Sequence, residues 1–125
     1  MQLNQVTLPT VDLPRAVDFY SRLGLKQIVA TEHYARFELP DGDATLSLHV
    51  VEKSEPSQAI IYFECEQLDQ RVKELIVAGI EFDTPPQDQR WLWREARLRD
   101  PDGNRLCLYH AGKNRRHPPW RIGSD

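Results

Sequence analysis

Hydrophobic and polar residues follow two different periods along the chain. In several short stretches they alternate one by one, and in two longer stretches the hydrophobic residues recur every three or four positions. Alternation is typical of a strand with one buried face, whereas the longer spacing is typical of an amphipathic helix. The pattern predicts helices over about residues 13–23 and 68–78, and strands over about residues 3–8, 26–31, 34–39, 44–51, 59–63, 95–99 and 105–109.

Both predicted helices carry boundary signals. Asp12 can cap the first helix, and Pro14 suits its first turn because no backbone N–H is needed there. Gly24 follows the first helix and Gly79 follows the second, and glycine tolerates the left-handed conformation in which many helices end.

Two similar turn sequences follow the predicted strands. Residues 100–103 read Asp-Pro-Asp-Gly, and residues 40–42 read Pro-Asp-Gly. Pro101 has the φ that the second position of a type I turn requires, and Asp100 can accept a hydrogen bond from the turn backbone. Each sequence therefore predicts a tight connection between two strands.

These features repeat along the chain. A shift of 55 residues places Gly24 on Gly79 and the first helix on the second, and a shift of 61 places Asp41 on Asp102. Helix faces, helix ends and turns recur in the same order, which indicates two βαβββ modules. The predicted organisation is a single domain, 1–125, with modules at about 1–52 and 58–112, a linker at 53–57 and a C-terminal tail at 113–125.

Composition and charge narrow the class of protein. The 125 residues are 40% hydrophobic and 28% charged, which is ordinary for a globular domain. A net charge of −3 does not suggest a nucleic-acid partner, and no apolar stretch approaches the roughly 18 residues of a membrane span. Two cysteines and no recognisable secretion signal make the cytoplasm the expected location.

The chain resembles the vicinal oxygen chelate superfamily over about residues 2–112. The resemblance rests on Asp-Leu-x-x-Ala-Val-x-Phe-Tyr at 12–20, on Asp-Pro-Asp-Gly-Asn at 100–104 and on the two modules. This superfamily includes glyoxalase I, extradiol dioxygenases, fosfomycin-resistance proteins and bleomycin-resistance proteins. The resemblance implies an α+β fold in which the modules form a curled mixed-sheet cleft for a ligand, with helices on the outside.

Side-chain alternation assigns one face of each strand to the core and the other to this cleft. The core set is uniformly apolar: Val6, Leu8, Leu46, Leu48, Ile61, Phe63, Leu106 and Leu108. The opposite set is mixed, as a small-molecule site should be: Gln5, Thr7, Ser47, His49, Ile60, Tyr62, Cys107 and Tyr109. These residues are the candidate ligand-binding groups, and ordinary polar contacts are the alternative.

The resemblance also implies positions for a metal, on the first and last strands of each module. Here those positions hold Gln5, Ser47, Ile60 and Cys107. Isoleucine has no donor atom, and a soft thiolate does not replace the usual carboxylate for a hard cation. We therefore expect no metal cofactor. The alternative is one divalent ion on Gln5, His49 and Cys107.

Other residues offer chemistry without a metal. His49 and Cys107 could act as a base and a nucleophile, although a strand cysteine is more often a small hydrophobic residue. Trp91 and Trp93 lie among arginines, so this segment could stack on a ligand and hold an anion. The alternative is that one indole packs in the core and the other covers a subunit interface. Alternation places Trp93 with Glu95 and Arg97 on one face and Arg94 on the other.

In the tail, Trp120 is expected to anchor against the body or a partner subunit.

The sequence thus favours a homodimeric protein that binds a small molecule with both aromatic and polar parts. The first alternative is an enzyme of the same superfamily, a lyase, isomerase or dioxygenase that depends on a metal or on His49 and Cys107. The second alternative is an interaction module with its tryptophans at an interface. Neither nucleic acid nor a membrane is expected as a partner.

Overall fold

The computed structural model of the chain describes residues 1–123, so the last two residues of the predicted tail lie outside the described part. Module 1 contains β1 (Gln5–Thr10), α1 (Leu13–Leu23), β2 (Lys26–Ala30), β3 (Tyr34–Glu38) and β4 (Thr45–Val50). Module 2 contains β5 (Ile60–Glu64), α2 (Leu68–Val77), β6 (Gln87–Asp88), β7 (Arg94–Arg99) and β8 (Arg105–His110), followed by the 3₁₀ turn η1 (Gly112–Asn114).

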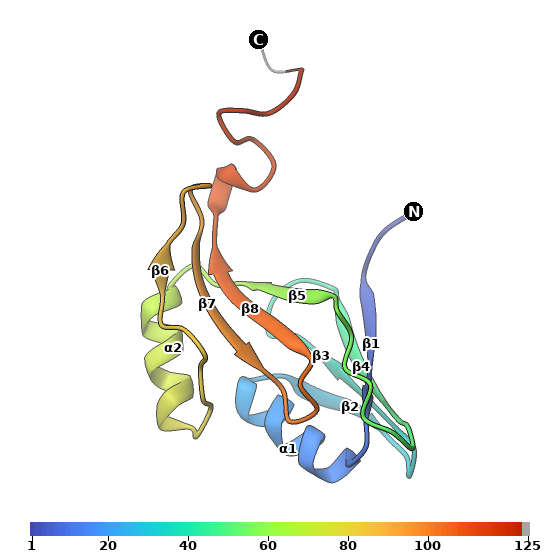
Figure 1. Cartoon of the computed structure of the whole chain (residues 1–125). Helices are drawn as coiled ribbons and strands as arrows, with labels where there is room; N and C mark the ends of the chain where they lie inside the picture. The colour runs from blue at the N-terminus through green and yellow to red at the C-terminus, as the bar shows by residue number, and fades with distance from the viewer. Residues whose placement is uncertain (124–125) are drawn as a thin grey trace.

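Each module forms one four-stranded mixed sheet of the same topology. Sheet 1 has the order β1-β4-β3-β2 and sheet 2 the order β5-β8-β7-β6. In both sheets the first strand pairs in parallel with the last, and the remaining pairs are antiparallel. The predicted α+β fold of two βαβββ modules is therefore confirmed (Figure 1).

One predicted strand differs from the observed one, and one observed strand, β6, has no predicted counterpart by residue range. The first strand begins at Gln5, where pairing with Thr45 begins, and Leu3 is fully exposed. It continues through Pro9, which an edge strand tolerates because that strand does not need every N–H for pairing. In module 2, β6 has only two residues, paired with the start of β7.

The helices end as the sequence predicts, and each end is held by the other helix. Asp12 accepts a hydrogen bond from the N–H of Arg15, and Gly24 has a left-handed φ of 108°. Arg71 of α2 donates to the carbonyl of Leu23 at 2.9 Å. In return, Arg22 of α1 donates to the last turn of α2, at the carbonyl of Ala78 (3.3 Å). These reciprocal contacts satisfy carbonyls that a helix C-terminus leaves free.

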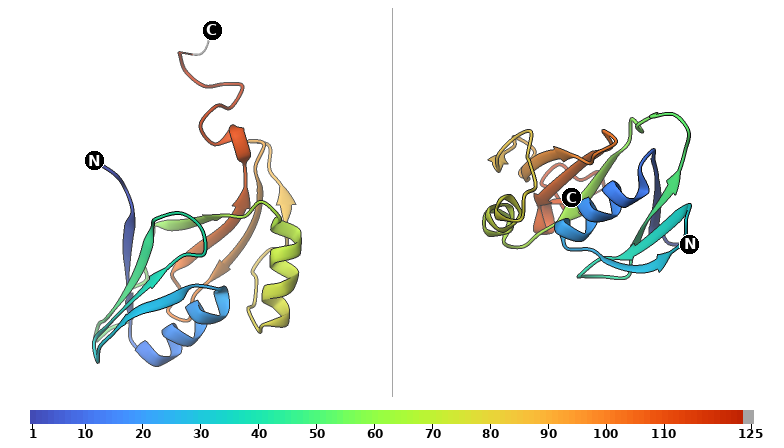
Figure 2. Two further views of the ribbon diagram at one scale, coloured as in Figure 1. Left: turned by 180° about the vertical axis from the view of Figure 1, so that it is seen from behind. Right: turned by 90° about the horizontal axis from the view of Figure 1, so that it is seen from below.

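The apolar faces of both sheets join one core with the two helices. This core contains Leu46 and Leu48 of sheet 1, Leu106 and Leu108 of sheet 2, and the buried side of α1. Figures 1 and 2 show α1 between sheet 1 and the turn end of sheet 2, while α2 covers sheet 2 farther from sheet 1. Because α1 lies on the apolar face of sheet 1, the polar face of that sheet is turned away from the module contact.

The 100–104 turn joins the modules through buried polar groups. Asp100 accepts hydrogen bonds from the hydroxyl of Tyr20 on α1 (2.7 Å), the N–H of Asp102 (2.9 Å), and both the N–H and the side-chain amide of Asn104 (2.9 and 2.8 Å). Burial, and then the Asp100 carboxylate, raise the pKa of Tyr20, so its phenol remains a donor. Asp102 also accepts from the N–H of Val11, at the end of β1. The turn is therefore part of the core.

The C-terminal tail leaves the body after η1 (Figure 1). Trp120 is 56% exposed, so the expected anchoring of this side chain against the body is wrong. Basic and proline residues surround it and leave little apolar sequence to fold back with it. None of the helices in residues 1–123 is long and apolar enough to cross a bilayer.

The Asp100 network gives the first prediction. Asp100→Ala should lower the free energy of unfolding by about 3–5 kcal/mol, because Tyr20 and Asn104 would keep buried donors without an acceptor. Tyr20→Phe should cost less, about 1–2 kcal/mol, since Asp100 keeps its other donors. Urea denaturation followed by circular dichroism measures both values.

Asp43→Ala is the matched control, because Asp43 is an exposed aspartate in the corresponding turn region of module 1. It should change the unfolding free energy by less than about 0.5 kcal/mol. Equal effects of the Asp100 and Asp43 substitutions would show that the buried network does not hold the modules together.

Candidate functional site

Three aromatic rings form a cluster on the polar face of sheet 2. Trp93 stacks on Tyr109 with ring centroids 4.7 Å apart and planes at 24°. Tyr62 meets Trp93 and Tyr109 edge to face, at 5.8 and 5.5 Å. Tyr109 is buried, while Tyr62 is 42% exposed. The cluster therefore has a packed base and an open aromatic edge that a flat ligand could contact.

A charged pair lies beside these rings. Arg97 donates from Nη2 and Nε to Oε1 of Glu95, at 2.8 and 3.2 Å, and its guanidinium carbon lies 5.8 Å from the Tyr62 ring centre. The other oxygen of Glu95 accepts from the Trp91 indole at 2.9 Å. Glu95 is only 3% exposed, so its charge is compensated within the protein. Arg94 lies on the opposite face with Asp69 and Asp88, as the alternation predicts.

Cys107 lies in the centre of sheet 2, paired with Tyr62 and Arg97 on the neighbouring strands. The side chain is fully buried. Burial, followed by the Glu95 charge, raises the pKa of the Cys107 thiol to about 12. A thiol in this environment stays protonated at neutral pH, which is the opposite of what a nucleophile requires.

The polar face of sheet 1 contains a chain of three hydrogen-bonding side chains. Ser47 is fully buried, and its hydroxyl lies 2.6 Å from that of Tyr34. Arg36 donates from Nε to the same Tyr34 oxygen at 2.9 Å. The three residues belong to β3 and β4, where Arg36 pairs directly with Ser47. They form a compact hydrogen-bonded set on a polar face that, within residues 1–123, has no ring-to-ring contact like those of sheet 2.

The other predicted residues of module 1 lie on the same polar face and are exposed. Gln5 accepts a hydrogen bond from the Thr45 hydroxyl at 2.8 Å, and Thr7 pairs with Ser47 across the sheet. His49 pairs with Tyr34 near the end of the face. Gln5, Thr7 and His49 therefore lie near Ser47, Tyr34 and Arg36 on this face, and the hydrogen bonds among those three residues do not involve them.

The structure thus gathers the sequence candidates into two groups rather than one. Gln5, Thr7, Ser47 and His49 lie on sheet 1, whereas Ile60, Tyr62, Trp91, Trp93, Cys107 and Tyr109 belong to module 2. In residues 1–123 no hydrogen bond, ion pair or ring contact joins the two polar faces. His49 and Cys107 are accordingly not partners within one chain.

Sequence reasoning missed Tyr34 and Arg36 and gave Glu95 and Arg97 no role. All four lie on third strands, β3 and β7, which pair with the strands that hold Ser47 and Cys107. A signal was available, because Ala-Arg followed by a large apolar residue occurs at 35–37 and at 96–98. The shift of 61 that aligns the two turns also aligns these two segments.

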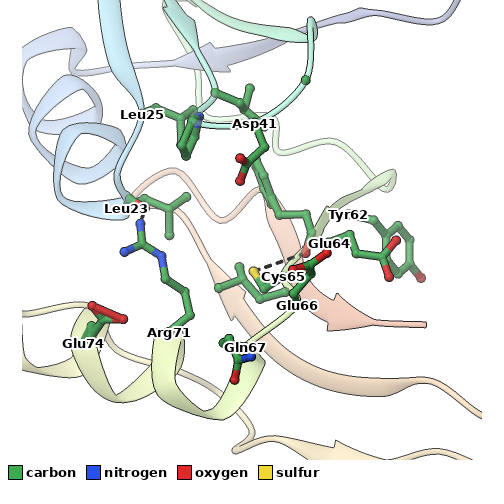
Figure 3. Close-up of a pocket in the computed structure, with 15 residues that line it drawn as sticks. Leu23, Leu25, Asp41, Tyr62, Glu64, Cys65, Glu66, Gln67, Arg71 and Glu74 are labelled. Carbon is green, nitrogen blue, oxygen red and sulfur yellow. Dashed lines mark hydrogen bonds between the residues drawn. The ribbon is translucent and has the colours of Figure 1, made fainter. Parts of the chain in front are cut away.

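A separate groove of about 680 Å³ lies between the modules (Figure 3). Its apolar lining includes Leu23, Leu25 and Phe63, and Figure 3 shows Arg71 reaching across it to the end of α1. Cys65 also lines it, and burial raises the pKa of that thiol. Of the predicted ligand-binding residues, only Tyr62 lines this groove, so it is distinct from the polar faces.

The two-module fold agrees with the comparison to known families. The family model described as the Glyoxalase/Bleomycin resistance protein/Dioxygenase superfamily matches residues 2–108. The chain belongs to this superfamily. The resemblance inferred from the sequence motifs is therefore confirmed.

Two solved structures share this fold, and one further protein is similar in sequence, each over most of the chain. A glyoxalase/bleomycin resistance protein/dioxygenase from Nocardioides superposes with a TM-score of 0.78 at 24% identity, covering 98% of this chain and 90% of that one. A bleomycin-binding protein complexed with bleomycin superposes with a TM-score of 0.71 at 23% identity, covering 88% and 98%. The uncharacterized protein YraH of Bacillus subtilis (strain 168) is 27% identical over 127 residues, covering 87% of this chain and 98% of its own length.

The metal positions that the superfamily resemblance implies hold a donor set that does not suit a hard divalent cation. The Gln5 amide oxygen is already hydrogen-bonded, Ile60 offers no donor atom, and the Cys107 thiol is buried with a raised pKa. Gln5 and His49 lie on sheet 1 while Cys107 lies on sheet 2, so the alternative set is not assembled within the chain. Among residues 1–123, no three His, Cys, Asp or Glu side chains form a group that could hold a metal ion.

The environment of Cys107 gives the second prediction. In the Cys65→Ser variant at pH 8, the remaining thiol should react with dithionitrobenzoate far more slowly in the folded protein than in urea. A pKa of about 12 leaves roughly a thousand-fold less thiolate than an ordinary thiol has, and burial blocks access as well.

The Cys107→Ser variant is the control, because Cys65 is only partly buried and should react faster. The absorbance of released thionitrobenzoate measures both rates. Rapid reaction of Cys107 in the folded protein would restore it as a candidate nucleophile.

Proposed function

We propose that this protein binds a small organic ligand without a metal cofactor, using the polar faces of its two sheets. The observation that carries the proposal is the Tyr62, Trp93 and Tyr109 cluster beside the Arg97–Glu95 pair. Aromatic rings offer a flat apolar surface, and the adjacent charged groups fix the orientation of a polar substituent. The ligand should therefore contain a planar ring and at least one polar group.

The fold of the protein supports binding of this kind. A solved protein of the same fold is complexed with bleomycin, so the two-module architecture can hold a small organic molecule. The buried Cys107 thiol with its raised pKa favours binding over nucleophilic catalysis. A chemical step is therefore not part of this proposal.

We further propose that the working unit is a homodimer. Sheet 1 supplies hydroxyl and guanidinium groups, sheet 2 supplies aromatic rings, and α1 keeps these faces from opposing one another within a chain. In a dimer, sheet 1 of one copy and sheet 2 of the other form the two walls of a cleft.

Two free cysteines suit a reducing compartment, which supports the cytoplasmic location we propose.

Binding of a neutral aromatic probe tests the ligand proposal. Benzamide should bind the wild-type protein, and Trp93→Leu should weaken that binding about two- to tenfold, the value of one aromatic contact. Saturation-transfer NMR titrations measure the affinity. Pre-treatment with EDTA should leave it unchanged.

Trp120→Leu is the matched control, because Trp120 lies in the exposed tail and not on either polar face. Equal binding by the Trp93→Leu variant would exclude the aromatic cluster as the binding surface. Loss of binding after EDTA treatment would show that a metal takes part.

The oligomeric state tests the proposed dimer. Light scattering coupled to size-exclusion chromatography should give twice the 14.6 kDa mass of the chain at micromolar concentration. A mass equal to one chain at about 100 µM would contradict a cleft built from two copies.

A further inference from the structure

The internal repeat places one arginine at the same position in each module. Ala35-Arg36-Phe37 on β3 corresponds to Ala96-Arg97-Leu98 on β7. Arg36 pairs with Ser47 on β4, and Arg97 pairs with Cys107 on β8, so both arginines occupy the centre of a polar face. The repeated position makes the differences between the two surroundings informative.

The residue two positions earlier determines the charge of each site. In module 2 this residue is Glu95, which binds Arg97 through two hydrogen bonds and cancels its charge. In module 1 it is Tyr34, whose neutral phenol accepts from Arg36. One module therefore has an ion pair where the other has a guanidinium that keeps its positive charge.

Among the residues that the structure describes, no other acid compensates Arg36. Glu38, which shares this face, forms its ion pair with Lys26, and no ion pair joins Arg36 to a carboxylate in residues 1–123. Within residues 1–123 its one hydrogen bond uses Nε, which leaves the two terminal nitrogens as donors. The side chain is half-buried, and its guanidinium carbon lies 5.4 Å from the Tyr34 ring centre. An arginine held in this way is pre-organised for an anion.

The Tyr34 hydroxyl extends this donor set, and its partner Ser47 is fully buried. Ser47 and Tyr34 are hydrogen-bonded at 2.6 Å directly beside Arg36. The hydrogen bond with Ser47, followed by the one from Arg36, lowers the pKa of Tyr34 despite an opposing effect of desolvation. A more acidic phenol is a stronger hydrogen-bond donor, so the cluster suits a negatively charged acceptor.

We infer that Arg36 and Tyr34 bind the carboxylate of an anionic ligand, and that the buried Ser47 positions the Tyr34 hydroxyl. The inference rests on the proposed function, because it specifies the polar group of the ligand that the aromatic cluster holds. One uncompensated charge on the face matches a monoanion, and the planar fork of arginine matches the two oxygens of a carboxylate. Together with the rings of sheet 2, this assigns an aromatic carboxylic acid as the ligand class.

Three probes of similar size separate the charge from the ring. Benzoate has both, benzamide has the ring alone, and cyclohexanecarboxylate has the charge alone. Wild-type protein should bind benzoate roughly tenfold more tightly than benzamide, as expected for hydrogen bonds to a charged group. NMR titrations at constant ionic strength measure the three affinities.

Arg36→Gln should remove the preference for benzoate, so that this variant binds benzoate and benzamide with equal affinity. Tyr34→Glu is the second variant, because it introduces at position 34 the carboxylate that module 2 carries at position 95. The new acid should neutralise Arg36 and reduce benzoate binding to the same extent without removing the arginine. Arg90→Gln, which removes an exposed charge from the connection between β6 and β7, is the control and should keep the preference.

The outcomes distinguish this inference from the proposed function. Equal binding of benzoate and benzamide by the wild type, or an unchanged preference in Arg36→Gln, would overturn the carboxylate site even if the aromatic cluster binds the ring. Equal binding of benzoate and cyclohexanecarboxylate, lost in Arg36→Gln, would support the carboxylate site while contradicting the role of the aromatic cluster.

Discussion

The structure depends on the hydrogen bonds that the buried carboxylate of Asp100 accepts. The Asp100 side chain accepts hydrogen bonds from the N–H groups of its own turn. It also accepts one from the hydroxyl of Tyr20 in the other module. A buried charge is tolerable only when donors surround it, and here the donors come from both halves of the chain. The turn and α1 therefore have to be positioned together, and this fixes how the two sheets are placed.

The two modules are similar in outline and differ where chemistry is expected. Reciprocal arginines cap the two helices, and both sheets place the last strand beside the first. Yet the 100–104 turn is buried against module 1, whereas the equivalent Asp41 is exposed. The polar faces diverge in the same way, because Ser47 corresponds to Cys107 and Tyr34 corresponds to Glu95. One repeated scaffold thus carries a cationic, hydroxyl-rich face and an aromatic, charge-compensated face.

Membership in the superfamily explains the scaffold but not the surfaces. The positions where the resemblance implies a metal carry an amide, a buried hydroxyl, an aliphatic chain and a buried thiol, and two arginines with polar partners lie on the adjacent strands β3 and β7. Strand pairing brings β3 and β7 against the strands that carry these positions, so their side chains share the same faces. The chemistry of this chain therefore has to be derived from its own residues.

The sequence by itself determined both helices, every strand except β6, the repeat and the two faces of each strand. These properties follow from local geometry: the alternation of side chains, Asp12 and Gly24 at the ends of α1, and proline and glycine in the turns. Only the tertiary structure decided that α1 separates the polar face of sheet 1 from sheet 2, that Glu95 neutralises Arg97, and that Arg36 keeps its charge. Those outcomes depend on which strands lie side by side and on which distant groups share a buried site, and alternation along one strand carries no information about either.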